Sequence, residues 1–510
     1  PQRSRSNSFE ISGFASLPKL PRDPQHTFLG MQKTSKYHVA ILGGGLAGLS
    51  SAEDLLRRAG DQVTVTVIDA GKQPGGVIRT KYHDGWVTEG SADSFLAVRP
   101  EGIELVKRLG LEDDIISVAD PVRRALILHK GQLIPIPAGF RLLAPGQIRS
   151  ILRTPALSLA GKLRVLCEPL ISKSNGDDES LEHFATRRLG REAFEQLVQP
   201  LVAGIWTADP MRLSMAAACP DFLAMEQEHG SLFMGERARL KQSPRGQAAS
   251  GARYGQFVSL SKGMETLPLR LTEYVQASGA DFIQEQITNL QYSRGRWQVV
   301  LDRHSPLEAD AVIVALPAPK AAQILRSACP AVASDLDEIE YAGSAVVSLG
   351  YEKTCIAHPL NAAGLVIPRS EGRSILAISF LSSKFPGRAP DGHALIRVFV
   401  GGALDPEAST LEDSVLLERV QREAADILGI QGVPKLSQIN RWHTSMPQYH
   451  VGHVERVRSL FSRVSAISHF ALAGAAYSGV GIPQVIASGQ QAARDVLESK
   501  NKESFNQFFY

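Results

Sequence analysis

The chain has 510 residues, 44% hydrophobic and 21% charged, and its length and composition suit a globular protein of two or three domains with large cores. The formal net charge is only +3, which gives no general affinity for polyanions, so nucleic acid is not an expected partner. The four cysteines are far apart and lack the CxxC spacing of zinc sites, so the sequence predicts no metal site.

The first 36 residues form a basic segment without an apolar core pattern. Serines, prolines and six cations dominate it, the cations being Arg3, Arg5, Lys19, Arg22, Lys33 and Lys36. This composition resembles the remnant of a mitochondrial transit peptide, and a disordered tail without a targeting role is the equal alternative. No apolar run reaches the roughly 18 residues that span a bilayer, so any membrane contact is expected to be peripheral.

Residues 37–69 carry the strongest pattern, which is a predicted strand, a glycine turn, a helix and a second strand that ends at Asp69. Gly43 permits a tight bend, Gly45 lets backbone N–H groups approach a pyrophosphate, and Gly48 lets the helix pack closely on the strand. Asp69 lies slightly farther from Gly43 than usual and is the expected ribose-binding acid. The segment therefore predicts a dinucleotide-binding unit.

A second glycine-rich segment follows this acid. Gly75 and Gly76 precede Arg79, and a run from Gly85 to Phe95 continues it. A glycine pair followed by arginine is a loop that flavoproteins use around the FAD diphosphate and isoalloxazine, whereas a plain NAD dehydrogenase does not need it. Taken alone, an ordinary turn and hairpin is the alternative.

The central region predicts helices and one loop. Residues 144–188 combine leucines with basic residues in helical segments. Such helices can lie on an anionic membrane surface, although a leucine stripe is more often part of a core. Residues 235–255 are polar, small and basic without periodicity, so we expect a mobile surface insertion there.

The chain is then expected to return to its first domain. Residues 256–260 predict a strand and a helix begins near Gly263. Residues 281–290 and 297–301 predict a pair of strands, and 310–317 a buried strand that closes the block.

Later segments predict a second sheet and a second glycine loop. Alternating strands at 345–350, 375–380 and 394–400 indicate the sheet of another domain, covered by a helix at 411–428. Residues 470–489 repeat the order strand, glycine-rich loop and helix. Backbone N–H groups at the start of that helix could stabilise negative charge on a reduced flavin at N1 and O2.

Several motifs occur in a fixed order between residues 37 and 498. They are Gly43 to Gly48, Gly75 to Arg79, Glu89-Gly90, Pro200 to Gly204 with Ala208-Asp209-Pro210 and Leu213-Ser214, Gly263-Met264, and Gly479 to Pro483. Together they resemble the protoporphyrinogen oxidase family, of the eukaryotic mitochondrial type, within the flavin amine oxidase superfamily. Lys262 departs from the family pattern, which usually has glycine there, and Gly90 to Asp93 is a variant of the loop over the flavin.

The resemblance implies an α/β and α+β fold. A discontinuous Rossmann-like FAD-binding domain would comprise 37–118, 255–330 and 440–498. A mixed-sheet substrate-binding domain would comprise 119–143, 207–254 and 331–439, and a helical membrane-associating domain 144–206.

The resemblance also implies an oxidoreductase that uses FAD and molecular oxygen to convert protoporphyrinogen IX to protoporphyrin IX, with hydrogen peroxide as co-product, in heme biosynthesis. Flavin N5 would accept a hydride, so no side-chain acid or base is expected. The implied location is the mitochondrial inner membrane, with peripheral attachment facing the intermembrane space. A homodimer and a handover of product to ferrochelatase are compatible with the resemblance.

The resemblance carries specific residues onto this chain. Its FAD contacts would be Gly43, Gly44, Gly45, Leu46, Ala47, Gly48, Asp69, Ala70, Gly76, Val77, Arg79, Gly90, Ser91, Ala92, Asp93, Ile287, Ala475, Val480, Gly481 and Ile482. Arg124 would bind a substrate carboxylate, with neighbouring Arg123 as the alternative. Gly204 would offer its carbonyl to a pyrrole N–H, and the apolar walls would be Val366, Ile378 and Phe399.

Two other classes of protein fit parts of the sequence. A non-catalytic binding protein similar to GDP-dissociation inhibitors would not need the flavin-facing loop from Gly479 to Pro483. Another oxidase or desaturase of the same superfamily is the third alternative, and an amine oxidase would be expected to show an aromatic cage where the C-terminal loop offers only Tyr477.

Overall fold

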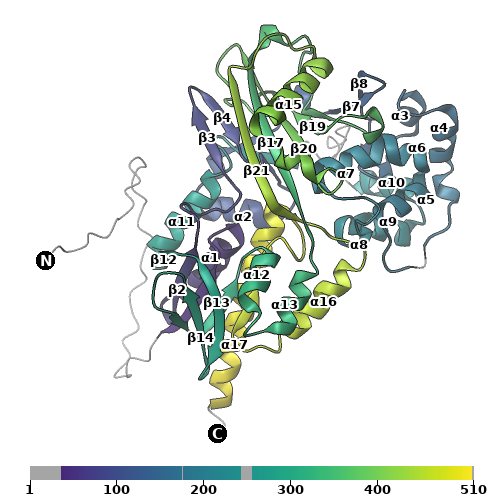
Figure 1. Cartoon of the computed structure of the whole chain (residues 1–510). Helices are drawn as coiled ribbons and strands as arrows, with labels where there is room; N and C mark the ends of the chain where they lie inside the picture. The colour runs from purple at the N-terminus through teal and green to yellow at the C-terminus, as the bar shows by residue number, and fades with distance from the viewer. Residues whose placement is uncertain (1–35, 175, 243–255, 508–510) are drawn as a thin grey trace. The chain divides into compact units, whose positions relative to one another are not determined.

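The computed structural model describes residues 36–174, 176–242 and 256–507. Residues 1–36 and 37–510 are separate units, and the fold described below is that of the second unit (Figure 1). Apart from Lys36, the segment interpreted as a transit-peptide remnant or tail lies outside the described residues.

One sheet consists of five parallel strands in the order β12, β2, β1, β16 and β22. Their bounds are β1 Tyr37–Leu42, β2 Val63–Asp69, β12 Asp281–Gln284, β16 Ala311–Val314 and β22 Phe470–Leu472. Central strands such as β1 and β16 are almost continuously apolar and buried, as expected for a parallel sheet that is covered on both faces. The strands come from distant parts of the sequence, so the first domain is discontinuous.

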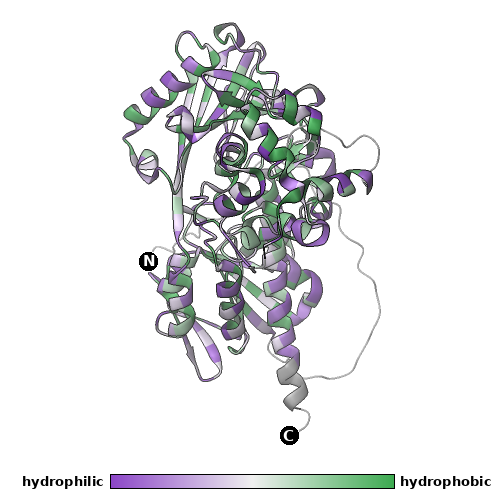
Figure 2. Ribbon diagram, turned by 90° about the vertical axis from the view of Figure 1, so that its right-hand side faces the viewer, coloured by the Kyte–Doolittle hydropathy of each residue, from purple (hydrophilic) through white to green (hydrophobic). Residues whose placement is uncertain are grey.

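Helices and a small sheet cover the two faces of this parallel sheet. One core includes residues of α1 Leu46–Ala59, α2 Pro100–Arg108, α11 Thr266–Ala277 and α17 Ile482–Gln507. The other includes α12 Ala318–Leu325, α13 Pro330–Asp337, α16 His453–Val464 and the antiparallel strands β13 Ile287–Ser293, β14 Arg296–Leu301 and β15 Leu307–Ala309. Hydrophobic and hydrophilic residues alternate along most of the helices, as expected when each helix buries one face (Figure 2).

The predicted strand 281–290 is wrong as a single element. It breaks at Glu285 into β12, which pairs with β2, and β13, which pairs with β14 in the small sheet. At the break, the Glu285 N–H donates to the Asp69 carbonyl at 3.0 Å and its buried carboxylate binds Arg303 and His304.

A second, mixed sheet has seven strands in the order β21, β17, β20, β19, β18, β7 and β8. Their bounds are β7 Ala125–His129, β8 Gln132–Pro135, β17 Tyr341–Glu352, β18 Gly364–Val366, β19 Ile375–Ser379, β20 His393–Gly401 and β21 Leu436–Pro447. The predicted helix over this sheet is α15 Asp413–Leu428, whose apolar residues join the core on one sheet face. β21 continues to Pro447, so the domain boundary placed at 440 cuts through a strand of this sheet.

Short elements connect the two sheets. They are β3 Thr80–His83, β4 Trp86–Glu89, β5 Phe95–Leu96, β6 Ile115–Ser117, β11 Phe257–Leu260 and α14 Leu381–Lys384. β3 and β4 form a hairpin, and β11 pairs with both β5 and β6.

Helices fill the region between β8 and β11. They are α3 Ile148–Arg153, α4 Leu159–Leu166, η4 Glu168–Leu170, α5 Leu181–Leu189, α6 Arg191–Ala193, the π-helix η5 Phe194–Val198, α7 Gln199–Trp206, α8 Met215–Ala218, α9 Pro220–His229 and α10 Leu232–Gln242. The expected loop at 235–255 is wrong for residues 235–242, because α10 packs on α9 and Glu236 binds Arg141 at 2.8 Å. Residues 243–255 lie outside the described residues.

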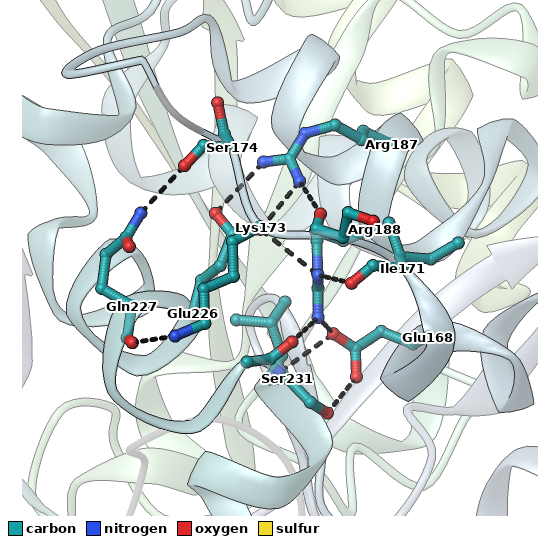
Figure 3. A network of polar contacts seen from close by, with 12 residues as sticks. Glu168, Ile171, Lys173, Ser174, Arg187, Arg188, Glu226, Gln227 and Ser231 are labelled. Carbon is teal, nitrogen blue, oxygen red and sulfur yellow. Dashed lines mark hydrogen bonds and ion pairs between the residues drawn. The ribbon is translucent and has the colours of Figure 1, made fainter.

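A buried network of charges holds these helices together (Figure 3). The Arg188 side chain on α5 is fully buried and donates to the Glu168 carboxylate of η4 and to the carbonyls of Ile171 and Gly230. The same carboxylate accepts hydrogen bonds from the Ser231 hydroxyl and the Leu232 N–H. The Arg188 guanidinium also lies 3.2 Å from the buried Glu226 carboxylate, while its Nε has no hydrogen-bond partner among the described residues. Pairing of the charges offsets most of the cost of burying them.

Glu168→Ala should destabilise the protein strongly, because it takes away the carboxylate that binds the buried Arg188 guanidinium, the Ser231 hydroxyl and the Leu232 N–H, and leaves Arg188 with Glu226 at 3.2 Å. We expect the free energy of unfolding to fall by about 3–5 kcal/mol in urea titrations followed by circular dichroism. Arg191→Ala is the matched control, since Arg191 forms an exposed pair with Glu195 and should change stability by less than about 1 kcal/mol. Equal effects of the two variants would contradict the role of the network.

Candidate functional site

The turn between β1 and α1 is built on close backbone contacts. A Cβ on Gly48 would lie 1.9 Å from the carbonyl oxygen of Gly43, so a side chain there would force the turn apart. α1 has no side-chain cap and no acidic residue in its first turn, and Leu46 and Ala47 there are buried. Its N-terminal N–H groups and helix dipole therefore suit a phosphate.

The second glycine pair packs directly on this turn. The Gly75 N–H donates to the Gly44 carbonyl at 2.8 Å, and a Cβ on Gly76 would lie 3.3 Å from the Cα of Gly45. The apolar side chain of neighbouring Val77 is 44% exposed. This arrangement is a cradle of bare backbone beside an uncovered apolar side chain, as a bound dinucleotide requires.

Asp69 ends β2 beside this cradle. Its carboxylate accepts hydrogen bonds from the N–H groups of Gly44 and Gly71, which fixes the glycine turn. Ala70 follows Asp69 in the sequence. The Glu285 N–H donates to the Asp69 carbonyl, and β13 begins two residues later with Ile287. The acid is thus positioned at the carboxyl edge of the parallel sheet, where ligands of such sheets bind.

Arg79 and Lys262 lie at the edge of the cradle. The Arg79 guanidinium donates to the carbonyls of Gln73 and Pro74 and to Glu265, so it shapes the loop from within. Lys262 takes a normal backbone conformation, and only Gly263 needs a positive φ, of 91°. The departure at Lys262 therefore leaves the turn intact.

The C-terminal glycine loop lies between β22 and α17, and Val480, Gly481 and Ile482 lead into α17. The Tyr449 hydroxyl donates to the Ala475 carbonyl and accepts from the Gly479 N–H at 2.9 Å.

The His453 ring stacks on Tyr449 at 4.0 Å and contacts the Tyr477 carbonyl at 3.2 Å. Burial lowers the pKa of His453 to about 4. The loop is therefore held by neutral groups near pH 7. Sequence reasoning missed Tyr449 and His453, because only the three-dimensional fold brings them to the loop.

One face of the seven-stranded sheet is arranged in two rows, which the strand register defines. The polar row is Gln438, Ser348, Arg397 and Ser379, and the apolar row, which begins with one asparagine, is Asn440, Val346, Phe399, Ala377 and Val366. A Cβ on Gly204 of α7 would lie 3.9 Å from Val366 and 4.0 Å from Ala377. The structure therefore brings together three of the predicted substrate residues, Gly204, Val366 and Phe399.

Ile378 is not part of this face. It lies opposite Leu365 and Val398 on the other face of the sheet, in the core beneath α15. A bulge between Ile375 and Ala377 shifts the alternation by one residue, so Ala377 takes the position that we expected for Ile378.

The two candidate arginines differ in their partners. The Arg123 side chain forms an ion pair with Asp120 at 2.6 Å and donates to the Val118 carbonyl. Arg124 is exposed beside β7, where its Nε donates to the Asn361 carbonyl at 2.9 Å. Within the described part of the chain no carboxylate lies within ion-pair distance of Arg124, which favours Arg124 over Arg123 as a carboxylate ligand.

The loop from Gly90 to Asp93 is anchored to the sheet. The Trp442 indole donates to the Gly90 carbonyl at 2.8 Å, and the Arg397 guanidinium donates to the Ser91 carbonyl. Burial alone would raise the pKa of Asp93, but the cations of Lys384 and Arg397 hold it well below its usual range. The Asp93 carboxylate is therefore fully engaged, so a cofactor would contact this loop through its backbone, including that of Ala92, or through the Ser91 hydroxyl.

Buried polar atoms beside this loop test whether a flavin fits. Three of them, Ser91 Oγ, Ser348 Oγ and Asn440 Nδ2, have no hydrogen-bond partner among the described residues. Burying such groups without a partner is costly, so a ligand with several polar ring atoms would satisfy them. Together with the glycine cradle, these residues fit FAD.

Comparison with known proteins agrees with this geometry. The sequence profile described as "Flavin containing amine oxidoreductase" matches residues 46–497. The chain is 34% identical to coproporphyrinogen III oxidase of Bacillus subtilis, covering 91% of this chain and 98% of that protein. It is 30% identical to human protoporphyrinogen oxidase, covering 90% and 98% respectively.

Solved structures show the same fold. A crystal structure from Exiguobacterium sp. 255-15 is 29% identical with a TM-score of 0.80, covering 92% of this chain and all of that one. A putrescine oxidase is 15% identical with a TM-score of 0.64, covering 91% and 100%, which supports the fold alone. Bacterial and human relatives both match over nearly the whole chain, so the similarity does not single out the eukaryotic mitochondrial type.

Gly48→Ala should weaken FAD binding at least tenfold, because the added methyl group would collide with the Gly43 carbonyl and open the turn. Titration of FAD into apoprotein, followed by flavin fluorescence, measures the Kd. Gly176→Ala is the matched control, since a Cβ there meets no atom closer than 3.6 Å. Unchanged FAD affinity in the Gly48 variant would contradict the assignment.

Proposed function

The chain belongs to the family of flavin-containing amine oxidoreductases, and we propose that it is a porphyrinogen oxidase. The proposed reaction removes six electrons and six protons from protoporphyrinogen IX to give protoporphyrin IX, with dioxygen reduced to hydrogen peroxide. Membership of a flavin family of oxidoreductases argues against the alternative of a flavin-free binding protein.

The observation that carries the proposal is the apolar row beside the flavin-binding loops. A porphyrinogen is a flexible, largely apolar ring with carboxylate side chains, so its site needs hydrophobic walls and a cation at the edge. Burying about 400 Å² of apolar surface contributes roughly 10 kcal/mol before the costs of binding, at about 25 cal/mol per Å². Val346, Phe399, Ala377 and Val366 offer such walls, while the exposed Arg124 directly precedes β7 of the same sheet.

The residues of the apolar row position the substrate rather than exchange protons with it, since none of them titrates near neutral pH. FAD, when bound, would supply the chemistry by accepting a hydride from a meso carbon. Gly204 would offer its carbonyl to a pyrrole N–H, and the pyrrole proton would be lost to water. Orientation of the ring would then be the main catalytic contribution of the protein.

Coproporphyrinogen III is the second candidate substrate. The 34% identity to an enzyme named for it favours this choice, while an apolar wall favours protoporphyrinogen IX, which has vinyl groups in place of two propionates. Purified FAD-loaded protein should convert at least one of the two porphyrinogens in air, with about three molecules of oxygen consumed per porphyrin formed. The ratio of kcat/KM values identifies the substrate, and no porphyrin above the spontaneous rate with either would overturn the proposal.

Arg124→Ala should raise KM for the porphyrinogen roughly 10- to 100-fold, because a charge-assisted hydrogen bond contributes about 1.5–3 kcal/mol. FAD content should be unchanged. Arg123→Ala is the matched control and should have little effect on KM, since that guanidinium is already paired with Asp120. A larger effect of the Arg123 variant would reverse the assignment.

We further propose that α3, α4 and η4 contact a membrane surface. They expose five apolar side chains, Ile148, Leu152, Leu159, Leu163 and Leu170, beside the exposed cations Arg149 and Arg153. α4 contacts both α3 and η4, so the three elements lie side by side. Each cation near an anionic membrane surface contributes about 1 kcal/mol to the free energy of binding. None of the helices in the described ranges is long and apolar enough to cross a bilayer, so the proposed contact is peripheral.

The mitochondrial inner membrane facing the intermembrane space is the location that this proposal favours if the basic N-terminal segment is a transit-peptide remnant. A homodimer and transfer of the product to ferrochelatase belong to the same proposal and need separate tests.

The double substitution Leu159→Glu and Leu163→Glu should reduce binding to vesicles that contain anionic lipid at least tenfold, because both side chains are exposed on α4. Co-sedimentation with vesicles measures the effect. Val433→Glu is the matched control, since it replaces an exposed apolar residue away from these helices. If the double variant bound as well as the unmodified protein, α4 would not be the contact surface.

A further inference from the structure

A buried group of three charges lies beside the loop over the expected flavin. We call it the Asp93 cluster, and it consists of Asp93, Lys384 and Arg397. The Lys384 ammonium is 3.0 and 2.9 Å from the two carboxylate oxygens of Asp93, and the Arg397 guanidinium is 2.9 Å from one of them. All three residues are at least nine-tenths buried.

The cluster joins the two halves of the site. Arg397 belongs to the polar row of the seven-stranded sheet, and Lys384 ends α14. The Arg397 guanidinium also donates to the Ser91 carbonyl, inside the loop that is expected to contact FAD. Its Nε is buried without a hydrogen-bond partner among the described residues, as is Ser91 Oγ.

The charges around this loop do not balance. Arg388 lies 3.5 Å from Glu89, and Arg79 lies 3.3 Å from Glu265, so each of these pairs is neutral when ionised. The Asp93 cluster has two cations and one carboxylate, which leaves one positive charge in excess. An uncompensated charge in a buried region is costly, so its environment favours a negative partner.

Reduction of a flavin creates such a partner. Oxidised flavin takes up two electrons and one proton, for example as a hydride from a meso carbon, and this adds one negative charge to the ring system. A fixed positive charge nearby stabilises the reduced form relative to the oxidised form.

We propose that Lys384 and Arg397, held by Asp93, raise the reduction potential of the bound flavin and so favour oxidation of the substrate. The inference rests on the proposed function only in assigning the flavin as the oxidant of the substrate. The residues tune and position the cofactor environment and exchange no proton or electron themselves.

The test is the two-electron reduction potential of the FAD-loaded protein, measured by equilibration with reference dyes in the absence of porphyrinogen. Lys384→Met and Arg397→Gln each remove the excess charge and leave Asp93 one cationic partner. Each should shift the equilibrium at least tenfold toward oxidised flavin, about 30 mV for a two-electron couple. Arg397→Lys should restore the potential, and Asp93→Asn should shift it in the opposite direction.

Arg441→Gln is the matched control. Arg441 lies on the neighbouring strand β21, but its side chain binds Asp413 and the carbonyls of Ser409 and Leu411 on the other face of the sheet. Its removal should leave the potential unchanged.

Opposite shifts for removing a cation and removing the carboxylate would support the proposal, since simple damage to the fold has no reason to change sign. The proposal is overturned if the potential is unchanged at equal FAD content, if all variants shift it in one direction, or if only FAD affinity falls. Because no porphyrinogen is present, the outcome of this test does not depend on whether the protein oxidises a porphyrinogen. The failure of the proposed function and the failure of this inference can therefore be told apart.

Discussion

The structure depends on how the loop from Gly90 to Asp93 is attached to the seven-stranded sheet. The loop follows β4, close to the glycine cradle, while its partners Trp442, Lys384 and Arg397 belong to the substrate half of the molecule. These contacts fix the distance between the cofactor loops and the apolar row. Orientation of substrate against flavin is the main contribution that such a site can make, so this attachment sets its geometry.

Other features of the fold support the same juxtaposition. Close packing of Gly48 on the Gly43 carbonyl holds α1 on the turn after β1, and close packing of Gly489 on the Ala47 carbonyl holds α17 on α1. Both glycine loops are thereby fixed at one edge of the parallel sheet. On the opposite side, α7 lies close enough to place Gly204 next to the apolar row. The buried charges around Arg188 and Glu168 brace the helices that surround α7. Rigid packing on both sides leaves the polar atoms between them available to a cofactor.

Local sequence patterns predicted the elements that neighbouring residues determine. Features that depend on contacts between distant parts of the chain could not be predicted from the sequence. The order of strand, glycine turn and helix at Gly43 to Gly48 is encoded by neighbouring residues, so it was predictable from sequence. Ile378 was misplaced because alternation along a strand cannot reveal a bulge. Lys384 was missed because its partner Asp93 is 291 residues away. α10 was missed because its sequence is polar, and its position depends on packing against α9.

The central claim is that the flavin and a porphyrinogen meet between the anchored loop and the apolar row. The most direct measurement is anaerobic mixing of FAD-loaded protein with excess porphyrinogen in a stopped-flow spectrophotometer. The account predicts that the visible flavin band bleaches and returns when oxygen is admitted, while porphyrin absorbance appears in step with flavin reduction. The account would be contradicted if dithionite bleached the visible flavin band but neither porphyrinogen changed it.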